Sequence, residues 1–352
     1  MTRFLEELPD EERSRVEEEA FPEWSSPMLA TLTHEPFSEP DWIYERKLDG
    51  VRLLVFRKGG RVRLLSRNRK EQGSTWPELV VALEGKDGAD VVADGEVVAF
   101  EGLEGKITSF SRLQGRMQIR DEEEAREKAK ELPAYLYLFD LLHLDGHDLT
   151  QLPLRTRKRI LRSELEWEDP IRYTPHRVGQ GEAYLREACE KGWEGLIAKA
   201  ADGTYVHSRS RKWLKFKCVN RQEFVVGGWT DPQGERVGLG ALLVGYHEEG
   251  TLRYAGKVGT GYTDEMLERL RSRLGEMERD TPPFGEEEEE EEEDLPGNGV
   301  HWATPKLVCE VGFTEWTGDG KLRHPRFLGL REDKDPEEVV RERPEAKPEE
   351  AA

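Results

Sequence analysis

Lys47 is the residue of this chain whose surroundings point most directly to covalent chemistry. It lies in the run Glu45-Arg46-Lys47-Leu48-Asp49-Gly50-Val51-Arg52, between stretches typical of short strands, and Asp49-Gly50 predicts a bend. An amine that attacks phosphorus forms a phosphoramidate, which divides one difficult displacement into two easier ones. The same octapeptide also fits a solvated strand edge. The other polar clusters of the chain must therefore distinguish between these two interpretations.

Three of those clusters place an acid, a base or an aromatic ring beside a predicted strand. Ser66-Arg67-Asn68 follows the predicted strand 62–65 and presents a guanidinium at a turn. Asp94-Gly95-Glu96 is expected to open a strand and to hold a carboxylate at a second turn. Phe139-Asp140 is expected to end the strand 134–139, where the ring is placed to stack on a purine base.

Two further clusters combine acids and bases. Glu194-Gly195 precedes Lys199, and Trp213-Leu214-Lys215-Phe216-Lys217 alternates in a way that places both of its lysines on one face of a strand. Two neighbouring ammonium groups repel each other unless an anion such as a triphosphate lies between them. Taken singly, each cluster is equally typical of a core or a solvated surface. Their order and spacing together favour a functional interpretation.

Composition indicates a globular chain without a membrane span. The 352 residues are 36% hydrophobic and 36% charged, with aromatic residues spread throughout. No run of about eighteen apolar residues occurs, and the first residues lack the apolar stretch of a signal peptide. The three cysteines, Cys189, Cys218 and Cys309, are far apart and odd in number. We therefore expect no disulfide framework, no zinc site, and a reduced, cytoplasmic protein.

The net charge of −20 is confined to three segments, residues 1–24, 286–294 and 332–352, so the rest of the chain is neutral. Residues 203–222 hold six Lys and Arg and no acid, which makes a locally basic stretch suited to phosphates. The acidic runs are typical of solvated tails and a loop. A halophilic surface is the alternative explanation, but its acids would be spread more evenly.

The chain is predicted to form two domains behind a lead-in. Residues 1–25 form an acidic helical extension, and residues 26–220 alternate strands with helices. Residues 221–335 hold five short, glycine-punctuated strands and one helix, which suits a small β-barrel of the OB type. An acidic loop at 286–294 and an acidic tail at 336–352 complete the organisation.

The clusters resemble, in order, the motifs of the covalent nucleotidyltransferases, which comprise ATP-dependent DNA ligases, RNA ligases and mRNA-capping guanylyltransferases. Phe313–Thr317 and Arg323–Lys334 resemble the C-terminal motif of the DNA ligases. Tyr254–Tyr262 and Gly228–Tyr246 are similar to the ligase module of bacterial end-joining proteins. This resemblance, over about residues 26–335, implies an α+β fold. Its nucleotidyltransferase domain would be ATP-grasp-like, with two antiparallel sheets and helices, followed by an OB-fold β-barrel.

The same resemblance implies an ATP-dependent DNA ligase that joins a 5′-phosphate to a 3′-OH in broken duplex DNA, during repair or end joining. AMP would pass from ATP to Lys47, then to the 5′-phosphate, and the 3′-OH would displace it. Expected catalytic residues are Lys47, Lys215, Lys217, Arg331, Asp333 and Lys334. Expected ATP-binding residues are Glu45, Lys47, Arg52, Arg67, Glu96, Phe139, Lys199, Lys215 and Lys217. Glu96 and Glu194 are expected to bind Mg²⁺ or Mn²⁺.

Lys47 has to lose its proton before it can attack, because a lysine of ordinary pKa, about 10.4, is protonated at neutral pH. Glu45 and Asp49 would favour the charged form. We therefore expect the cations Lys199, Lys215 and Lys217, together with a metal, to lower the pKa of Lys47.

The alternatives are an RNA ligase, a capping-type transferase that uses GTP, and a non-catalytic OB scaffold. The ligase-like Arg331–Lys334 segment argues against the first two, and the completeness of the motifs argues against the scaffold. One departure from the family is Arg69, which stands where a glycine is common. Expected partners are nicked or broken duplex DNA and a Ku-type end-binding protein, with no membrane. We expect a nucleoid-associated monomer.

Overall fold

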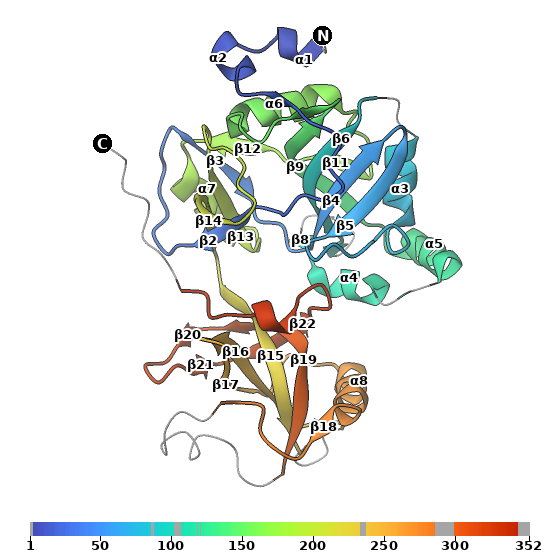
Figure 1. Cartoon of the computed structure of the whole chain (residues 1–352). Helices are drawn as coiled ribbons and strands as arrows, with labels where there is room; N and C mark the ends of the chain where they lie inside the picture. Colours follow the sequence, from blue (N-terminus) through green and yellow to red (C-terminus); the bar gives the residue numbers. More distant parts are fainter. Residues whose placement is uncertain are drawn as a thin grey trace. The chain divides into compact units, whose positions relative to one another are not determined.

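The computed structural model describes residues 3–343 apart from 86–87, 102–106, 118, 120, 233–236 and 286–298. Contacts divide the described chain into two units, which meet in sequence between Cys218 and Val219 (Figure 1). The predicted boundary lay two residues later. The predicted acidic loop at 286–294 lies outside the described residues, as does the end of the predicted tail from residue 344.

Two large β-sheets dominate the first unit, and the strands β7 and β8 form a small third sheet among its described residues. The larger sheet has seven strands in the order β1-β10-β9-β6-β4-β5, with β11 beside β9, and the smaller has the order β12-β3-β13-β14-β2 (Figure 1). Among the described strands, both sheets are antiparallel except for the pairs β11–β9 and β14–β2. The strands of this unit are β1 (Glu17–Glu18), β2 (Leu29–Leu32), β3 (Trp42–Arg46), β4 (Val51–Lys58), β5 (Arg61–Ser66), β6 (Val91–Val98), β7 (Phe100–Glu101), β8 (Ile107–Thr108), β9 (Tyr135–Leu144), β10 (His147–Asp148), β11 (Ile171–Tyr173), β12 (His176–Val178), β13 (Gly195–Ala200) and β14 (Arg209–Lys217).

The central strands of the larger sheet are buried on both faces. Leu53 and Val55 of β4 point into a core that includes Trp76 and Leu79, while Leu54 and Phe56 point the other way, as the two-residue period of a strand requires. That second cluster also holds Trp213 of β14, so it joins the larger sheet to the smaller. The helices of this unit are α1 (Arg3–Glu6), α2 (Asp10–Arg13), α3 (Pro77–Glu84), α4 (Phe110–Met117), α5 (Glu122–Glu131), α6 (Leu154–Glu164) and α7 (Gly181–Glu190).

A predicted strand start and a predicted strand end prove to lie in the middle of strands. Asp94-Gly95-Glu96 lies inside β6 instead of opening a strand, and Phe139-Asp140 lies inside β9 instead of ending it. Gly95 suggested a break, but its role is close packing, because a Cβ there would approach the Tyr137 carbonyl oxygen of β9 to 2.7 Å. The prediction was wrong because glycine marks both turns and close backbone contacts.

The predicted acidic extension is part of the first unit. Phe4 and Leu8 are buried in the main core, at 4% and 3% exposure, and β1 pairs with β10 at the edge of the larger sheet. Two large apolar side chains are enough to fix a segment that otherwise reads as a solvated helix. No helix among the described residues is long and apolar enough to cross a membrane.

The second unit is a β-structure with one α-helix among its described residues. Its main sheet runs β17-β16-β15-β19-β18, with β22 also paired to β19, and Leu267, Leu270 and Leu274 of α8 are buried in its core. The predicted tail begins within this unit, since Val339 is buried and its carbonyl oxygen accepts from the His247 N–H. The elements are β15 (Asn220–Thr230), β16 (Leu242–Glu248), β17 (Thr251–Val258), α8 (Asp264–Gly275), β18 (Glu278–Arg279), β19 (Val300–Phe313), β20 (Glu315–Trp316), β21 (Leu322–Arg323), β22 (Arg326–Leu330) and the 3₁₀ turn Pro336–Glu338.

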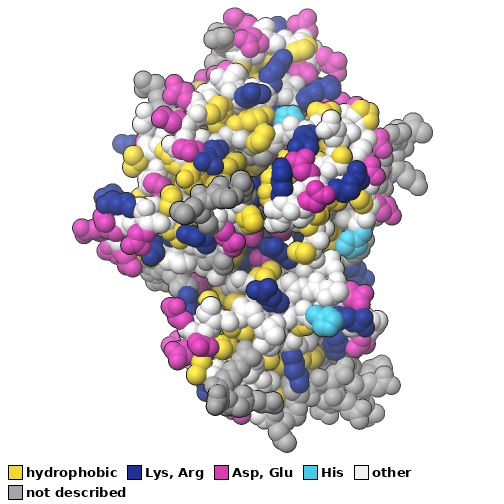
Figure 2. Space-filling model, turned by 180° about the vertical axis from the view of Figure 1, so that it is seen from behind, with side chains coloured by type: hydrophobic (Ala, Val, Ile, Leu, Met, Phe, Trp, Pro, Cys, Tyr) yellow, Lys and Arg dark blue, Asp and Glu magenta, His cyan; other side chains and the backbone are white. Residues whose placement is uncertain are grey.

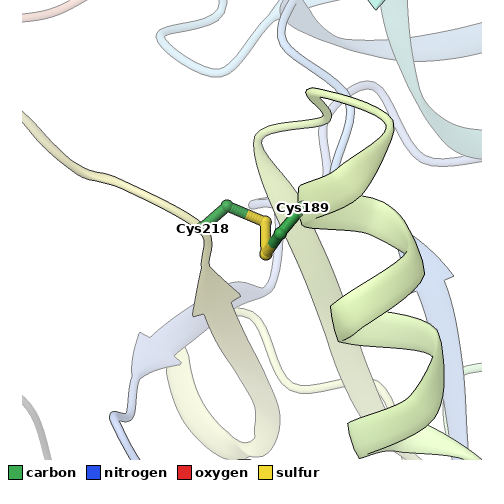
Figure 3. The surroundings of a disulfide bond; sticks show 2 residues. All are labelled: Cys189 and Cys218. Carbon is green, nitrogen blue, oxygen red and sulfur yellow. A yellow bond between two sulfur atoms is a disulfide. The ribbon is translucent and has the colours of Figure 1, made fainter.

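A disulfide joins Cys189 to Cys218, contrary to the expectation from cysteine number and spacing (Figure 3). Cys189 lies in the last turn of α7 and Cys218 directly follows β14; the fold brings their Cα atoms to 5.3 Å from each other. Cys309 is a buried free thiol. Sequence separation says nothing about proximity across a sheet, and for that reason the fully reduced state was predicted wrongly.

The first prediction concerns this bond. Closing a loop of 29 residues should stabilise the protein by about 3–4 kcal/mol through the entropy of the unfolded chain. Dithiothreitol should lower the free energy of unfolding of the wild type, measured by denaturant titration, by about this amount. It should not change the free energy of unfolding of the Cys189→Ser/Cys218→Ser variant. Thiol titration in denaturant should find one thiol before reduction; three thiols would contradict the bond.

His301 provides a pH-dependent contact in the second unit. Its Nδ1 lies 2.8 Å from Glu278 Oε1 and its Nε2 lies 2.9 Å from Asp231 Oδ1, while the ring stacks on Trp229. The hydrogen bond that the protonated ring donates to Glu278 raises the pKa of His301; burial opposes the shift and Asp231 reinforces it. A raised pKa means that the stabilisation is complete below the unfolded pKa, near 6.5, and is lost as the pH rises through the folded value.

The second prediction follows from that sign. The free energy of unfolding of the wild type should exceed that of His301→Gln at a pH of about 5.5. This difference between the two proteins should be about 1 kcal/mol smaller at a pH of about 9. Urea unfolding of both proteins at the two pH values measures this difference. An equal difference at both would show that the imidazolium charge contributes nothing.

Candidate active site

Lys47 lies where the chain passes from one sheet of the first unit to the other. β3 belongs to the smaller sheet and β4 to the larger, so Lys47 to Gly50 form a crossing between sheets. The Lys47 N–H donates to the Gly195 carbonyl oxygen at 2.9 Å, which fixes the start of the crossing against β13. A Cβ at Gly50 would come within 2.1 Å of the Val97 carbonyl oxygen, so only glycine permits this path.

The Lys47 ammonium forms an ion pair with Glu194. The two side chains are 20% and 5% exposed, so water screens the pair weakly. Burial alone would lower the pKa of Lys47, but the charge and hydrogen bond of Glu194 outweigh it, and Asp49 and Glu96 add to the rise. The net shift is upward. The prediction that nearby lysines lower this pKa is therefore wrong for the structure described, where Glu194 is the dominant neighbour.

Glu45 is a second buried acid, held by two lysines. Its Oε1 accepts from Lys158 at 2.5 Å and its Oε2 lies 2.6 Å from Lys199. Burial would raise the pKa of Glu45, but Lys158 and Lys199 together lower it. Lys199 was expected to meet a phosphate; it is 2% exposed, and burial lowers its pKa although Glu45 opposes the shift. Lys158 was not predicted, because it appears in the sequence as an ordinary base of helix α6.

Arg52 is bound to Asp94, which is fully buried. Nε and Nη2 of Arg52 donate to the two Asp94 oxygens at 2.5 and 2.6 Å. The Tyr205 hydroxyl donates to Asp94 Oδ2 at 2.6 Å. Burial would lower the pKa of Arg52, but Asp94 raises it, so the guanidinium stays charged. Asp94 belongs to a segment that the sequence singled out, without a role; Tyr205 carried no signal beyond its place in the basic stretch.

Phe139 belongs both to the core and to this site. The ring is 7% exposed and meets Trp213 edge-on at 6.0 Å. Lys199 Nζ lies 4.1 Å and the Arg52 guanidinium carbon 4.7 Å from its centroid, distances typical of cation–π contacts. The aromatic platform expected for a purine therefore lies beside two of the expected nucleotide-binding cations.

The remaining predicted residues of this unit surround the same crossing. Glu96 lies opposite Arg52 in the β4–β6 register, and its charge acts on Lys47. Lys215 and Lys217 lie opposite Ile197 and Gly195 on the strand next to Glu194. Leu214, just before Lys215, and Phe216, between the two lysines, are buried, as the alternation predicted.

Arg67 occupies the turn after β5, as expected. Arg69 two residues later has φ +59°, a conformation that glycine adopts without cost. Its guanidinium lies 5.3 Å from the Trp24 ring, which offers a packing reason for arginine at this position.

Arg331, Asp333 and Lys334 gather in the second unit. Arg331 donates to both Asp333 oxygens at 2.9 and 2.8 Å, and Lys334 Nζ lies 3.0 Å from Glu223. Burial would lower the pKa of Arg331, but Asp333, Glu223 and Glu310 raise it. The three predicted residues thus form one ion cluster, in a different unit from Lys47.

Two family models match separate parts of this chain. The model of the ATP dependent DNA ligase domain matches residues 27–217, and that of the ATP dependent DNA ligase C terminal region matches 235–334. The multifunctional non-homologous end joining protein LigD of Pseudomonas aeruginosa is 37% identical over 93% of this chain, which spans 38% of that protein. The DNA ligase of Natronomonas pharaonis is 36% identical over 84% of the chain and 52% of its own length.

Among solved structures, mycobacterial DNA ligase D complexed with ATP and MES matches with a TM-score of 0.63 and 34% identity. The match covers 90% of this chain and 98% of that one. The α+β architecture, a nucleotidyltransferase domain followed by an OB-fold domain, is therefore the one expected from the sequence. With a family model covering more than half of its length, this chain belongs to the ATP-dependent DNA ligases.

Proposed function

We propose that the chain joins a 5′-phosphate to a 3′-OH in duplex DNA at the expense of ATP, through AMP bound to Lys47. The observation that carries the proposal is the partly exposed Lys47 amine between two sheets, paired with Glu194. Arg52, Lys199 and Phe139 lie around the same crossing. A rigid nucleophile beside cations and an aromatic ring is suited to the α-phosphate of a nucleotide.

The first step requires a proton to leave Lys47. The ammonium first gives up one proton to expose its lone pair. As the Nζ–phosphorus bond then forms, the bond from phosphorus to pyrophosphate breaks, and the nitrogen gives up a second proton to the departing pyrophosphate or to water and keeps its third. Glu194 is hydrogen-bonded to Nζ and can accept one. The same carboxylate raises the pKa of Lys47, so the resting amine is charged and needs this acceptor.

Glu96 and Glu194 are suited to hold Mg²⁺ or Mn²⁺ only together with phosphate oxygens. Both carboxylates act on Lys47 electrostatically, but no group of three or more His, Cys, Asp or Glu in the described ranges could hold a metal alone. Two acids plus phosphates and water form a common Mg²⁺ site. A bound cation would neutralise charge on the leaving group. It would also offset the carboxylate charge that raises the pKa of Lys47.

The remaining tasks of the reaction are binding of the nucleotide and orientation of the leaving group. We assign them to residues of the first and the second unit, respectively. Arg52, Arg67, Lys215 and Lys217 would contact the phosphates or ribose of ATP, and Phe139 its adenine. Arg331, Asp333 and Lys334 would orient the departing pyrophosphate. Phosphoryl transfer leaves mostly positioning and electrostatics for a protein to supply, and these are the contributions that such residues make.

The biological setting is proposed from the relatives alone. The chain spans about 40% of the length of the LigD proteins that it matches. We infer a role in DNA repair and end joining at nicked or broken duplexes, as a nucleoid-associated monomer working with a Ku-type end-binding protein. On the face drawn in Figure 2, Lys and Arg side chains lie among Asp and Glu, as expected for a body of balanced charge.

The third prediction tests the nucleophile. With α-labelled ATP and Mg²⁺, the wild type should become labelled, and Lys47→Ala should lose label by at least 10³-fold because no amine remains at the crossing. Lys191→Ala is the matched control, since Lys191 also pairs with a carboxylate, Glu187, but on the surface of α7. It should label normally. Equal labelling of Lys47→Ala and the wild type would refute the assignment.

The choice of nucleotide separates the alternatives. Label from ATP with sealing of a nicked DNA duplex supports a DNA ligase. Label from GTP in preference to ATP would indicate a capping-type enzyme, and sealing restricted to RNA ends would indicate an RNA ligase.

The fourth prediction concerns the acid between two lysines. Lys158→Met leaves Glu45 buried with one cation, which should cost about 3 kcal/mol of unfolding free energy. Lys130→Met is the control, because the Lys130–Glu127 pair is about 70% exposed on both sides and should contribute less than about 1 kcal/mol. Urea denaturation measures both. A loss no greater than that of the control would mean that Lys158 is not the stabilising partner of Glu45.

A further inference from the structure

A closed hydrogen-bond network surrounds the carboxylate of Asp94. The fully buried carboxylate accepts from Arg52 Nε at 2.5 Å, from Arg52 Nη2 at 2.6 Å and from the Tyr205 hydroxyl at 2.6 Å. The Tyr205 oxygen in turn accepts from the Met28 N–H at 2.8 Å, and the Met28 carbonyl accepts from Arg52 Nη2 at 3.1 Å. Both main-chain groups of Met28 thus belong to the network.

The network links the two sheets of the first unit. Arg52 and Asp94 lie on β4 and β6 of the larger sheet. Met28 directly precedes β2, and Tyr205 lies on the connection between β13 and β14, so both lie on segments attached to strands of the smaller sheet. Tyr205 is 1% exposed and meets Trp213 edge-on at 5.8 Å, so its ring cannot turn away without disturbing the core. Burial raises the pKa of Tyr205 well above 10, so the hydroxyl remains a donor.

These bonds determine which edge of Arg52 faces a ligand. A guanidinium has five N–H donors, and here the Nε–H and both Nη2–H groups are directed to Asp94 and Met28. Among the residues that the structure describes, Nη1 has no hydrogen-bond partner. The side chain is 21% exposed, and its guanidinium lies beside Phe139. The Nη1 edge is therefore the one presented to a nucleotide.

We propose that Tyr205 is a positioning residue for self-adenylylation, whose hydroxyl fixes the Asp94 carboxylate so that Arg52 presents its Nη1 edge to ATP. The proposal rests on the proposed function. Carboxylate rotation about the last torsion of an Asp is loosely restrained, and Asp94 Oδ2 would keep only one of its two donors without the hydroxyl. The hydrogen bonds given for the Tyr205 hydroxyl join it to Asp94 and Met28, so its effect on the nucleotide would pass through Arg52.

The test is the single-turnover rate of self-adenylylation with α-labelled ATP, measured over a range of ATP concentrations. Tyr205→Phe removes one oxygen and keeps the ring. The ratio of the maximal rate to the half-saturating ATP concentration should fall about tenfold, the usual effect of losing a hydrogen bond to a charged group. Tyr44→Phe is the matched control. Tyr44 is fully buried and its oxygen also accepts a main-chain N–H, from Glu39, without contact to Asp94. Tyr44→Phe should change this ratio less than twofold. It should change the melting temperature by about as much as Tyr205→Phe does.

A double-mutant cycle distinguishes positioning from a structural role. If Tyr205 acts through Arg52, then Tyr205→Phe should reduce the rate less than twofold further in an Arg52→Lys background. The proposal would be overturned if Tyr205→Phe lowered the rate a further tenfold in the Arg52→Lys protein. It would also be overturned if Tyr205→Phe caused no loss in the protein that keeps Arg52. Neither result touches the proposed function, which fails only if the wild type takes no label from ATP or if Lys47→Ala keeps it.

Discussion

The ion pair between Lys47 and Glu194 is the interaction on which the arrangement of this site depends. It lies at the crossing from the smaller sheet to the larger, and the elements that carry it are fixed by main-chain contacts. The Lys47 N–H is bonded to Gly195, and the Cys218 N–H is bonded to the Glu194 carbonyl oxygen. Both partners of the pair are therefore held by the backbone of the sheet, and neither depends on a flexible loop for its position.

The pair also sets the chemical problem that the protein has to solve. A carboxylate beside an amine makes the amine a poorer nucleophile at rest, because the charged form is favoured. The same carboxylate is the group next to the proton that has to leave. Burial works in the opposite direction on Lys47, so any charge that compensates Glu194 lets burial lower the pKa. We propose that Glu194, once its charge is compensated by a bound cation, would no longer hold the Lys47 amine in its charged form.

The positions of the predicted residues follow from the sequence better than their contacts do. Strand alternation was enough to place Lys215 and Lys217 on one face of β14 and the buried Leu214 and Phe216 on its other face. The order of motifs was enough to gather Lys47, Glu96, Glu194 and Arg52 around one crossing. Which acid meets which base could not be predicted, since Glu45 pairs with Lys158 and Lys199 and leaves Lys47 to Glu194. Such pairings depend on side-chain direction across two sheets.

The same limit explains why the sequence predicted neither the disulfide nor the mid-strand positions of two motifs, because contacts between distant segments override local signals.

The central claim of the account is that AMP becomes attached to Lys47. Mass spectrometry of peptides from protein incubated with ATP and Mg²⁺ tests it most directly. The account predicts AMP on the peptide that contains Lys47, at its Nζ atom. AMP on Lys199, Lys215 or Lys217 instead, with Lys47 unmodified, would contradict it.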